Sequence, residues 1–270
     1  MDPWGCKPPE PVIQRDHPFA DRLVFCWVPT DQNVAVTQDL VTGYKGAGTN
    51  LTNASHLAQT KYGQAVKFVA ASSTKLTFLD KALYDPTVLS GFTVSVWIRA
   101  DALTNATYFI GKYTASGWGL GFDGSSIQYV NNSDVCAKTP ALTAGKAYHI
   151  VAVWDGAQTR IFTDAVQGAD VACSAAPIST TNALTLGALS ASFYSTVSLA
   201  GAMIWRRPFS AAEAKALYSD PWAVVRGPNA GDRMMDTAWS SVKAPSAATV
   251  VAQQTERKIG LCQPRIMLGR

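Results

Sequence analysis

The stretch from residue 146 to residue 162, KAYHIVAVWDGAQTRIF, constrains the fold more than any other part of the chain. Large apolar side chains occur at every second position of its first half, which is the period of a β-strand. The positions between them are also mostly apolar, so we expect a strand that is buried on both faces. Asp155-Gly156 is a strong signal for a tight hairpin turn, and Arg160, Ile161 and Phe162 begin the returning strand. The pattern predicts an antiparallel hairpin that needs a second sheet to cover it.

A second strand is predicted at residues 92–99, FTVSVWIR, where the same period divides the side chains between two faces. We expect this strand to belong to the sheet that covers the hairpin. A meander should follow at residues 108–130. Three glycines of the meander lie inside a predicted strand, at Gly117, Gly119 and Gly121. Glycine in a strand lets another chain segment come close, and we expect such a segment here.

Three stretches resemble one family: GFTVSVWIRA at 91–100, LTAGKAYHIVAVWDGAQTRIF at 142–162, and LTLGALSASFYSTVSLAGAMIWRRPFSAAEAKALY at 184–218. They are similar to the laminin-G-like, concanavalin A-like jelly roll, in the family's order and spacing, and the resemblance covers about residues 20–220. It implies an all-β fold, a sandwich of two antiparallel sheets. Ser210 and Glu213 have the spacing of a capping box and predict a short C-terminal helix after the last strand.

Both ends of the chain differ from this middle part. Residues 1–19 contain five prolines, which exclude a helix or a central strand. We therefore predict three parts: an extended Pro-rich arm at 1–19, a sandwich domain at 20–222, and an extended C-terminal arm at 223–270. Its final stretch, residues 257–270, combines apolar with basic side chains and has no acidic residue, which suits an assembly arm that docks on an acidic partner: Arg257, Lys258, Ile259, Leu261, Arg265, Ile266, Met267, Leu268 and Arg270. The alternative is a solvated tail.

The five cysteines, at positions 6, 26, 136, 173 and 262, are widely spaced and include no CxxC pair, so we expect no zinc site. Free thiols in a reducing cytosol are the default expectation. The alternative for one pair is a bridge between Cys136 and Cys173.

The N-terminus lacks the basic start and apolar core of a signal peptide, and no run of about 18 apolar residues occurs. We expect no membrane and no nucleic-acid partner.

Catalytic patterns are absent from the sequence. The jelly-roll glucanases that the resemblance brings in carry an E-x-D-x-x-E triplet on one strand, and this chain has none. The mid-strand His149 has the position of a buried structural histidine, and no Gly-x-Ser-x-Gly elbow occurs. We therefore predict that the protein is not an enzyme and needs no cofactor.

Calcium is not expected either. Many laminin-G-like domains hold calcium in rim loops, but the acidic pair of the family's last strand is replaced here by Ala202 and Met203. A rim site built from Asp123, Asp134 and Asp164 is the alternative, although scattered loop aspartates are usually turn residues.

Two functions remain. The first is a structural protein of a virus particle of tailed-bacteriophage type, made in the host cytoplasm. It would be a capsid decoration or cement protein, or another virion-surface protein, bound to capsid or tail proteins and to copies of itself. Residues 216–222, ALYSDPW, and 225–228, VRGP, resemble the C-terminal segment that follows such domains in phage proteins.

The second function is that of a module of adhesin or tail-fibre type that binds carbohydrate or a host-surface receptor. Its candidate glycan contacts are aromatic and amide side chains of presumed loops and strand ends: Trp118, Tyr129, Asn131, Asn132 and Tyr194. For Trp118 and Tyr129 the alternative is packing inside the sandwich.

Overall fold

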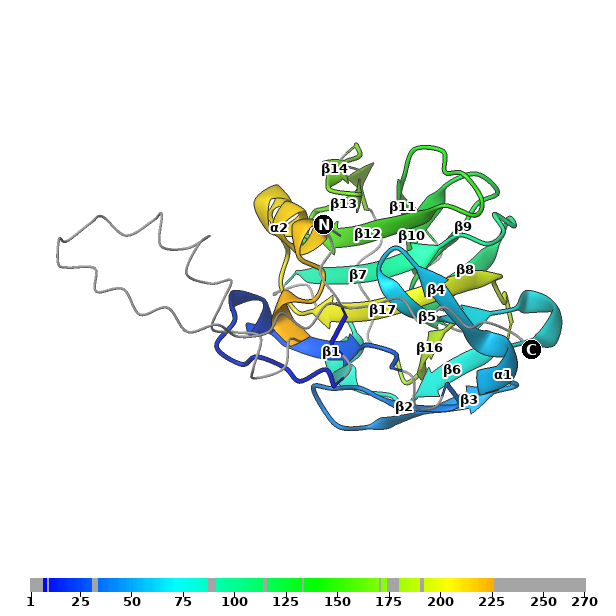
Figure 1. Ribbon diagram of the computed structural model, residues 1–270. Coiled ribbons are helices and arrows are strands. Elements are labelled where there is room, and N and C mark those ends of the chain that lie inside the picture. The colour runs from blue at the N-terminus through cyan, green and yellow to red at the C-terminus, as the bar shows by residue number, and fades with distance from the viewer. Residues whose placement is uncertain are drawn as a thin grey trace, which may run out of the picture. The chain divides into compact units, whose positions relative to one another are not determined.

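The computed structural model describes residues 7–8, 10–30, 34–86, 91–113, 116–132, 134–169, 171–173, 180–189 and 192–225. It shows two antiparallel sheets packed face to face (Figure 1). This confirms the predicted all-β jelly-roll sandwich. The assembly-arm residues at 257–270 lie outside the described part of the chain.

Nine strands form one sheet within the described residues. Their order is β14 (Val166–Gln167), β13 (Gln158–Thr163), β12 (Ala147–Trp154), β7 (Phe92–Arg99), β17 (Val197–Trp205), β5 (Gly63–Phe68) and β4 (Leu57–Thr60), while β1 (Leu23–Trp27) pairs with β17 and β15 (Val171–Ala172) with β13. The predicted hairpin is confirmed as β12 and β13, and Gly156 adopts φ 107° in its turn. The expected place of residues 92–99 is wrong, because β7 pairs directly with β12 in the same sheet. Each strand has one strongly apolar face, and this alternation does not distinguish neighbours in one sheet from partners across the core.

Eight strands of the described chain form the second sheet. Their order is β11 (Asp134–Lys138), β10 (Ile127–Asn131), β9 (Gly117–Phe122), β8 (Thr107–Tyr113), β16 (Leu184–Leu186), β6 (Lys75–Phe78), β3 (Lys45–Thr49) and β2 (Val36–Gln38). Strands β8 to β10 are the predicted meander, whereas β11 was not predicted.

The helical elements are short: η1 (Pro18–Ala20), α1 (Asn53–His56), η2 (Ala70–Ser72), η3 (Ala82–Tyr84), α2 (Ala211–Ser219) and η4 (Ala223–Val225). The capping box of α2 is confirmed. The Ser210 hydroxyl accepts from the Glu213 backbone N–H at 3.2 Å, and the Glu213 carboxylate accepts from the Ser210 backbone N–H at 2.8 Å. Two otherwise unsatisfied N–H groups thereby gain partners, which starts the helix at Ala211.

Apolar side chains from the facing surfaces of the two sheets fill the space between them. The alternating positions Phe92, Val94, Val96 and Ile98 of β7 belong to this core, as do Ile150, Ala152 and Trp154 of β12. On the other face of the same strands, Trp97, Val151 and Val153 belong to a second core on the outer surface of the nine-stranded sheet, beside the buried polar residues Thr93, Ser95 and His149.

The second core is covered by the ends of the domain. Helix α2 supplies Ala214 and Leu217, and the residues after it supply Trp222, Val224 and Val225. Trp222 is fully buried, and a Cβ on Gly201 would lie only 2.9 Å from its ring. A side chain at position 201 would therefore displace Trp222 from β17.

The N-terminal segment also packs on this surface. The Val12 and Gln14 backbone N–H groups donate to the carbonyls of Val225 and Val224 at 3.3 and 2.8 Å. The Lys7 ammonium donates to the carbonyls of Gln64 and Ala200, both at 2.7 Å. The described part of 1–19, the segment predicted as an extended arm, thus packs on the sandwich. The physical reason for this packing is the apolar outer face of the sheet, which the chain's own ends remove from water.

The predicted boundary after residue 222 moves for the same reason. Val224 and Val225 are fully buried, and the compact unit of the domain runs from Met1 to Gly227.

A disulfide joins Cys136 and Cys173, whose Cα atoms are 4.9 Å apart. Cys136 lies on β11 of the eight-stranded sheet, and Cys173 follows β15 of the nine-stranded sheet. The bond therefore links the two sheets to each other. The default expectation of free thiols is wrong for this pair. Cys26 is a free thiol on β1, and complete burial raises its pKa well above the usual value.

Candidate functional site

The two outer surfaces of the sandwich differ in how far the chain covers them. Helix α2, η4 and the N-terminal segment cover the nine-stranded sheet. On the eight-stranded sheet, Trp118, Leu120 and Phe122 of β9 point into the core between the sheets. Because side chains alternate along a strand, the glycines between them point outward. The candidate binding site therefore lies on the outer surface of β8 to β10.

A loop of the chain itself lies over these glycines. The Cδ1 atom of Leu189 would be 2.5 Å from a Cβ on Gly111 and 3.0 Å from a Cβ on Gly119. The Tyr108 ring would be 2.6 Å from a Cβ on Gly121. The expectation that glycines of β9 admit a close segment is confirmed for Gly119. The absence of a side chain at these glycines lets Leu189 and the Tyr108 ring approach the sheet closely.

Phe193 stands at the exposed part of this loop, with 52% of its surface accessible. Its ring contacts the Tyr108 ring edge to face, with centroids 6.0 Å apart and planes at 77°. Two hydrogen bonds fix the loop backbone, from Tyr108 N–H to the Phe193 carbonyl at 2.9 Å and from Ser195 N–H to the Gly187 carbonyl at 3.0 Å. We call Tyr108 and Phe193 the aromatic platform.

The backbone of Phe193 is strained. Its φ is 55°, in the left-handed region that bulky side chains rarely adopt. Such a conformation costs on the order of 1–3 kcal/mol and persists where the surroundings enforce it. The loop thus holds a large apolar side chain in water at an energetic cost, although burying it would stabilise the fold.

Polar groups border the platform. The Gln128 side-chain amide on β10 donates to the Tyr108 hydroxyl at 3.4 Å. Burial raises the pKa of Tyr108, so the phenol stays protonated and keeps its O–H donor. Tyr194 follows Phe193 in the chain and is half-buried. An aromatic surface beside hydroxyl and amide groups can accept a ligand that has both apolar C–H faces and hydroxyls.

The structure places the five sequence-predicted glycan contacts differently. Trp118, Tyr129 and Asn131 are buried to within 1% and cannot reach a ligand. The predictions for these three residues are wrong, and the alternative of packing inside the sandwich is confirmed for Trp118 and Tyr129. Asn132 is a half-buried turn residue with φ 47°. Tyr194 alone among the five lies beside the platform in the chain.

Sequence reasoning missed both platform residues. Tyr108 lies in a predicted strand of the meander, and Phe193 lies in a loop without periodicity. The signal that remained was a large aromatic residue amid small residues, SASFYS at 190–195.

The rim aspartates do not gather into a metal site. Asp123 pairs with Lys138 at 2.8 Å and accepts from the Ser126 backbone N–H. Asp164 follows β13 on the other sheet and accepts from the His149 backbone N–H at 2.8 Å. The side chain of Asp134 lies outside the described residues. Among the side chains that are described, no group of three or more His, Cys, Asp or Glu could hold a metal ion.

Ser95 and His149 lie within 2.7 Å of each other, measured from the hydroxyl to the Nε2 atom. Both are fully buried in the second core, and the imidazole stacks on Trp97 with centroids 4.8 Å apart. The Asp164 carboxylate meets the histidine's backbone N–H, whereas a catalytic triad needs a carboxylate on the ring Nδ1. The pair is therefore structural, as expected for a mid-strand histidine.

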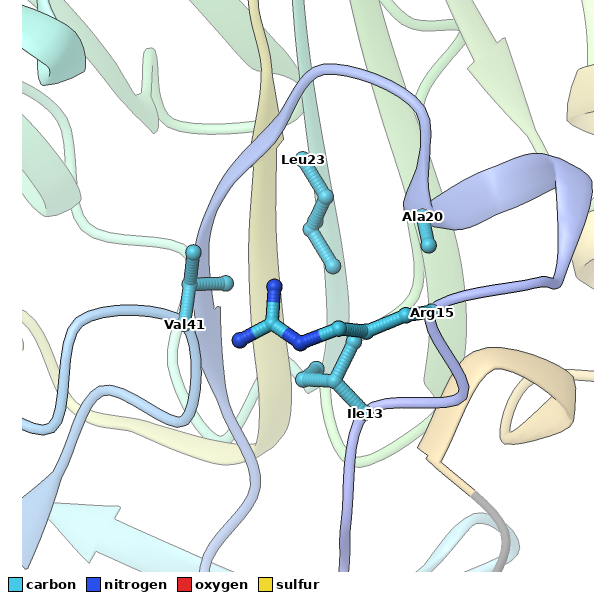
Figure 2. Close-up of a pocket in the computed structure, with 5 residues that line it drawn as sticks. All are labelled: Ile13, Arg15, Ala20, Leu23 and Val41. Atoms are coloured by element: carbon cyan, nitrogen blue, oxygen red, sulfur yellow. The ribbon is translucent and has the colours of Figure 1, made fainter.

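A small pocket lies between the N-terminal segment, β1 and the loop that follows β2 (Figure 2). Its lining consists of apolar side chains and one guanidinium: Ile13, Arg15, Ala20, Leu23 and Val41. This lining holds no carboxylate, so it lacks the groups that glycoside hydrolysis requires.

The two-sheet architecture defines a jelly-roll protein of the concanavalin A type. The profile of the concanavalin A-like lectin/glucanases superfamily, Laminin_G_3, matches residues 71–215, which is more than half of the chain. The chain belongs to this family. No curated protein matches it, and the described residues include no helix that is long and apolar enough to cross a membrane.

Several solved structures share the fold. The binding domain of Paraclostridial mosquitocidal protein 1 is 12% identical, with a TM-score of 0.58 over 73% of this chain and 52% of that one. The binding domain of botulinum neurotoxin serotype D is 11% identical, with a TM-score of 0.55 over 73% and 50%. Trypanosoma rangeli sialidase in complex with 2,3-difluorosialic acid is 14% identical, with a TM-score of 0.53 over 75% and 34%. The chain thus spans about a third to a half of their lengths, and the likeness concerns the fold alone.

Proposed function

We propose that the protein is a non-enzymatic binding module that recognises carbohydrate, free or on a host-surface receptor, through the aromatic platform. The observation that carries this proposal is the exposure of Phe193 on a strained, hydrogen-bonded loop. Sugar rings present apolar C–H faces that pack on aromatic rings, while their hydroxyls need polar partners. The Tyr108 hydroxyl, which accepts from the Gln128 amide at 3.4 Å, is such a partner within the platform.

The family and its neighbours support a binding role. The name of the superfamily covers lectins, and two of the similar structures are binding domains of toxins. Because folds of this kind serve several functions, the platform has to carry the argument for this chain.

A non-enzymatic role fits the chemistry of the platform. Glycoside hydrolysis uses two carboxylates placed on either side of the scissile bond. The side chains that form or border the platform, Tyr108, Gln128, Phe193 and Tyr194, carry none. This composition lacks the carboxylate pair of that mechanism and suits reversible binding.

Phe193→Ala is expected to weaken binding of the recognised glycan by about 3- to 10-fold, the range of one lost aromatic contact. Phe193→Tyr should retain most of the affinity because it keeps the ring. Glycan-array screening followed by titration calorimetry on the best ligand measures both variants.

Leu79→Ala is the matched control for this experiment. Leu79 is 66% exposed and follows β6, away from the platform loop in the chain. If Leu79→Ala and Phe193→Ala weaken binding equally, or if no glycan binds the wild-type protein, the platform is not a carbohydrate site.

We propose as a second candidate a structural protein on the surface of a tailed-phage virion, bound to capsid or tail proteins and to copies of itself. The segment ALYSDPW at 216–222 favours it through its resemblance to phage proteins. In this chain the segment has a structural task, since Leu217 and Trp222 belong to the second core. A virion role would therefore rest on residues 226–270, which lie outside the described part of the chain.

Truncation at residue 236 tests the virion role. We expect the shortened protein to keep its melting temperature, because the described residues already form both cores without any residue beyond 225. It should no longer join the particle in an assembly assay. Incorporation at the occupancy of the full-length chain would contradict the role of the C-terminal segment.

A further inference from the structure

Lys112 on β8 is a charged side chain without any solvent exposure. Its ammonium is surrounded by four oxygen atoms: Asp80 Oδ1 at 2.7 Å, Asp85 Oδ1 at 2.9 Å, and the carbonyls of Lys81 and Thr180 at 3.0 and 3.3 Å. We call these four oxygens the Lys112 cage. Lysine is almost never fully buried in proteins unless it is paired, so the cage is what permits the charge to lie there.

The ligand set of the cage is unusual for lysine. Two carboxylates and two backbone carbonyls are hard oxygen donors, the kind that calcium selects. They come from two separate segments, residues 80–85 and Thr180, which the central charge holds together. A single surface ion pair would need only one carboxylate and would leave the ammonium in water.

The cage also organises a rim loop of the sandwich. Residues 80–85 contain η3, and the Tyr84 carbonyl accepts from the Trp118 indole N–H at 2.9 Å. The Thr180 backbone N–H donates to the second oxygen of Asp85 at 3.3 Å. Loss of the central cation would leave two carboxylates facing each other at this point, so the loop depends on a positive charge.

We propose that the Lys112 cage is a divalent-cation site whose cation is supplied by the protein itself. The ammonium of Lys112 takes the place of a calcium ion, and the rim loop is ordered without metal. Removal of the ammonium turns the cage into a calcium site. The inference is independent of the proposed glycan binding.

The geometry allows this exchange. Calcium–oxygen distances are about 2.3–2.6 Å, so the four oxygens need to move inward by roughly 0.1–1.0 Å, the Thr180 carbonyl the most. Truncation of the lysine stem opens room for the water ligands that complete a coordination shell of six to eight. The side chain of Asp80 is 37% exposed, which gives the ion a path from solvent.

The test compares Lys112→Ala with the wild-type chain in EDTA and in millimolar CaCl₂. Lys112→Ala should melt at a lower temperature than wild type in EDTA and regain about 5 °C or more in calcium, as expected for a ligand far above its dissociation constant. Wild type should melt at the same temperature in both buffers. Terbium luminescence sensitised by Trp118, which touches the same loop, should appear for Lys112→Ala and be absent for wild type.

Two variants make the result specific. Lys112→Met removes the charge but fills the stem's space, so calcium should not stabilise it. Lys112→Ala combined with Asp85→Asn should lose the calcium response. The proposal is overturned if calcium stabilises wild type as much as Lys112→Ala, or if the Asp85→Asn change leaves the response intact. Failure of Lys112→Ala to fold both with and without calcium overturns it as well, because a bound ion would restore the loop.

Discussion

Removal of the Cys136–Cys173 disulfide is expected to lower the free energy of unfolding by about 4 kcal/mol. The bond closes a loop with a sequence separation of 37 residues, and this loop length corresponds to about 4 kcal/mol in the chain-entropy description of cross-links. Urea denaturation of the oxidised wild-type protein and of the double variant Cys136→Ala/Cys173→Ala measures the difference.

The reductant provides the control. Dithiothreitol should bring the wild-type curve to that of the double variant and leave the double variant unchanged. Equal unfolding free energies for the oxidised wild type and the double variant would show that the bond does not form. Since the bond links one sheet to the other, its loss should also free the edge formed by β11 and β15.

Acidification from pH 8 to pH 4 is expected to lower the free energy of unfolding by about 3 kcal/mol through His149 alone. Burial lowers the pKa of His149 to about 3, with a smaller contribution from the positive charge of Lys61. In the unfolded chain the His149 imidazole takes up a proton below about pH 6.5. In the folded chain the same imidazole stays neutral down to about pH 3. The stabilisation is therefore complete above pH 6.5 and decreases as the pH falls towards 3.

Denaturation of the variant His149→Gln over the same pH range isolates this effect. Carboxylates also titrate near pH 4, and both proteins share their contributions. The difference between the two pH profiles should grow below pH 6.5, with the wild type losing more stability. Parallel profiles would mean that His149 is accessible to protons in the folded protein.

Local patterns in the sequence determined the central hairpin and the last helix. The alternation along residues 148–154, the Asp155-Gly156 turn, and the capping box of Ser210 and Glu213 all depend on neighbours within a few residues. Such contacts are the same in the isolated pattern and in the fold, so the hairpin, the last helix and the fold class were predictable.

Tertiary structure decided which segments meet. The alternation along β7 predicts a strand but not its partner, and only the three-dimensional pairing placed it beside β12 in one sheet. The N-terminal segment has no periodic pattern, yet it packs on the apolar outer surface of that sheet. The free energy gained by burial depends on the apolar area removed from water and not on the order of residues in the sequence.

The candidate site likewise depends on tertiary packing and not on local sequence patterns. A tryptophan in an alternating strand has an equal chance of facing inward or outward until the sheet is placed, and Trp118 faces inward. Phe193 owes its exposure to a loop held by hydrogen bonds to Tyr108 and Gly187, and Lys112 owes its burial to oxygens from residues 80–85 and 180. These groups are separated by many residues along the chain, so their meeting depends on the packed fold and leaves no local mark in the sequence.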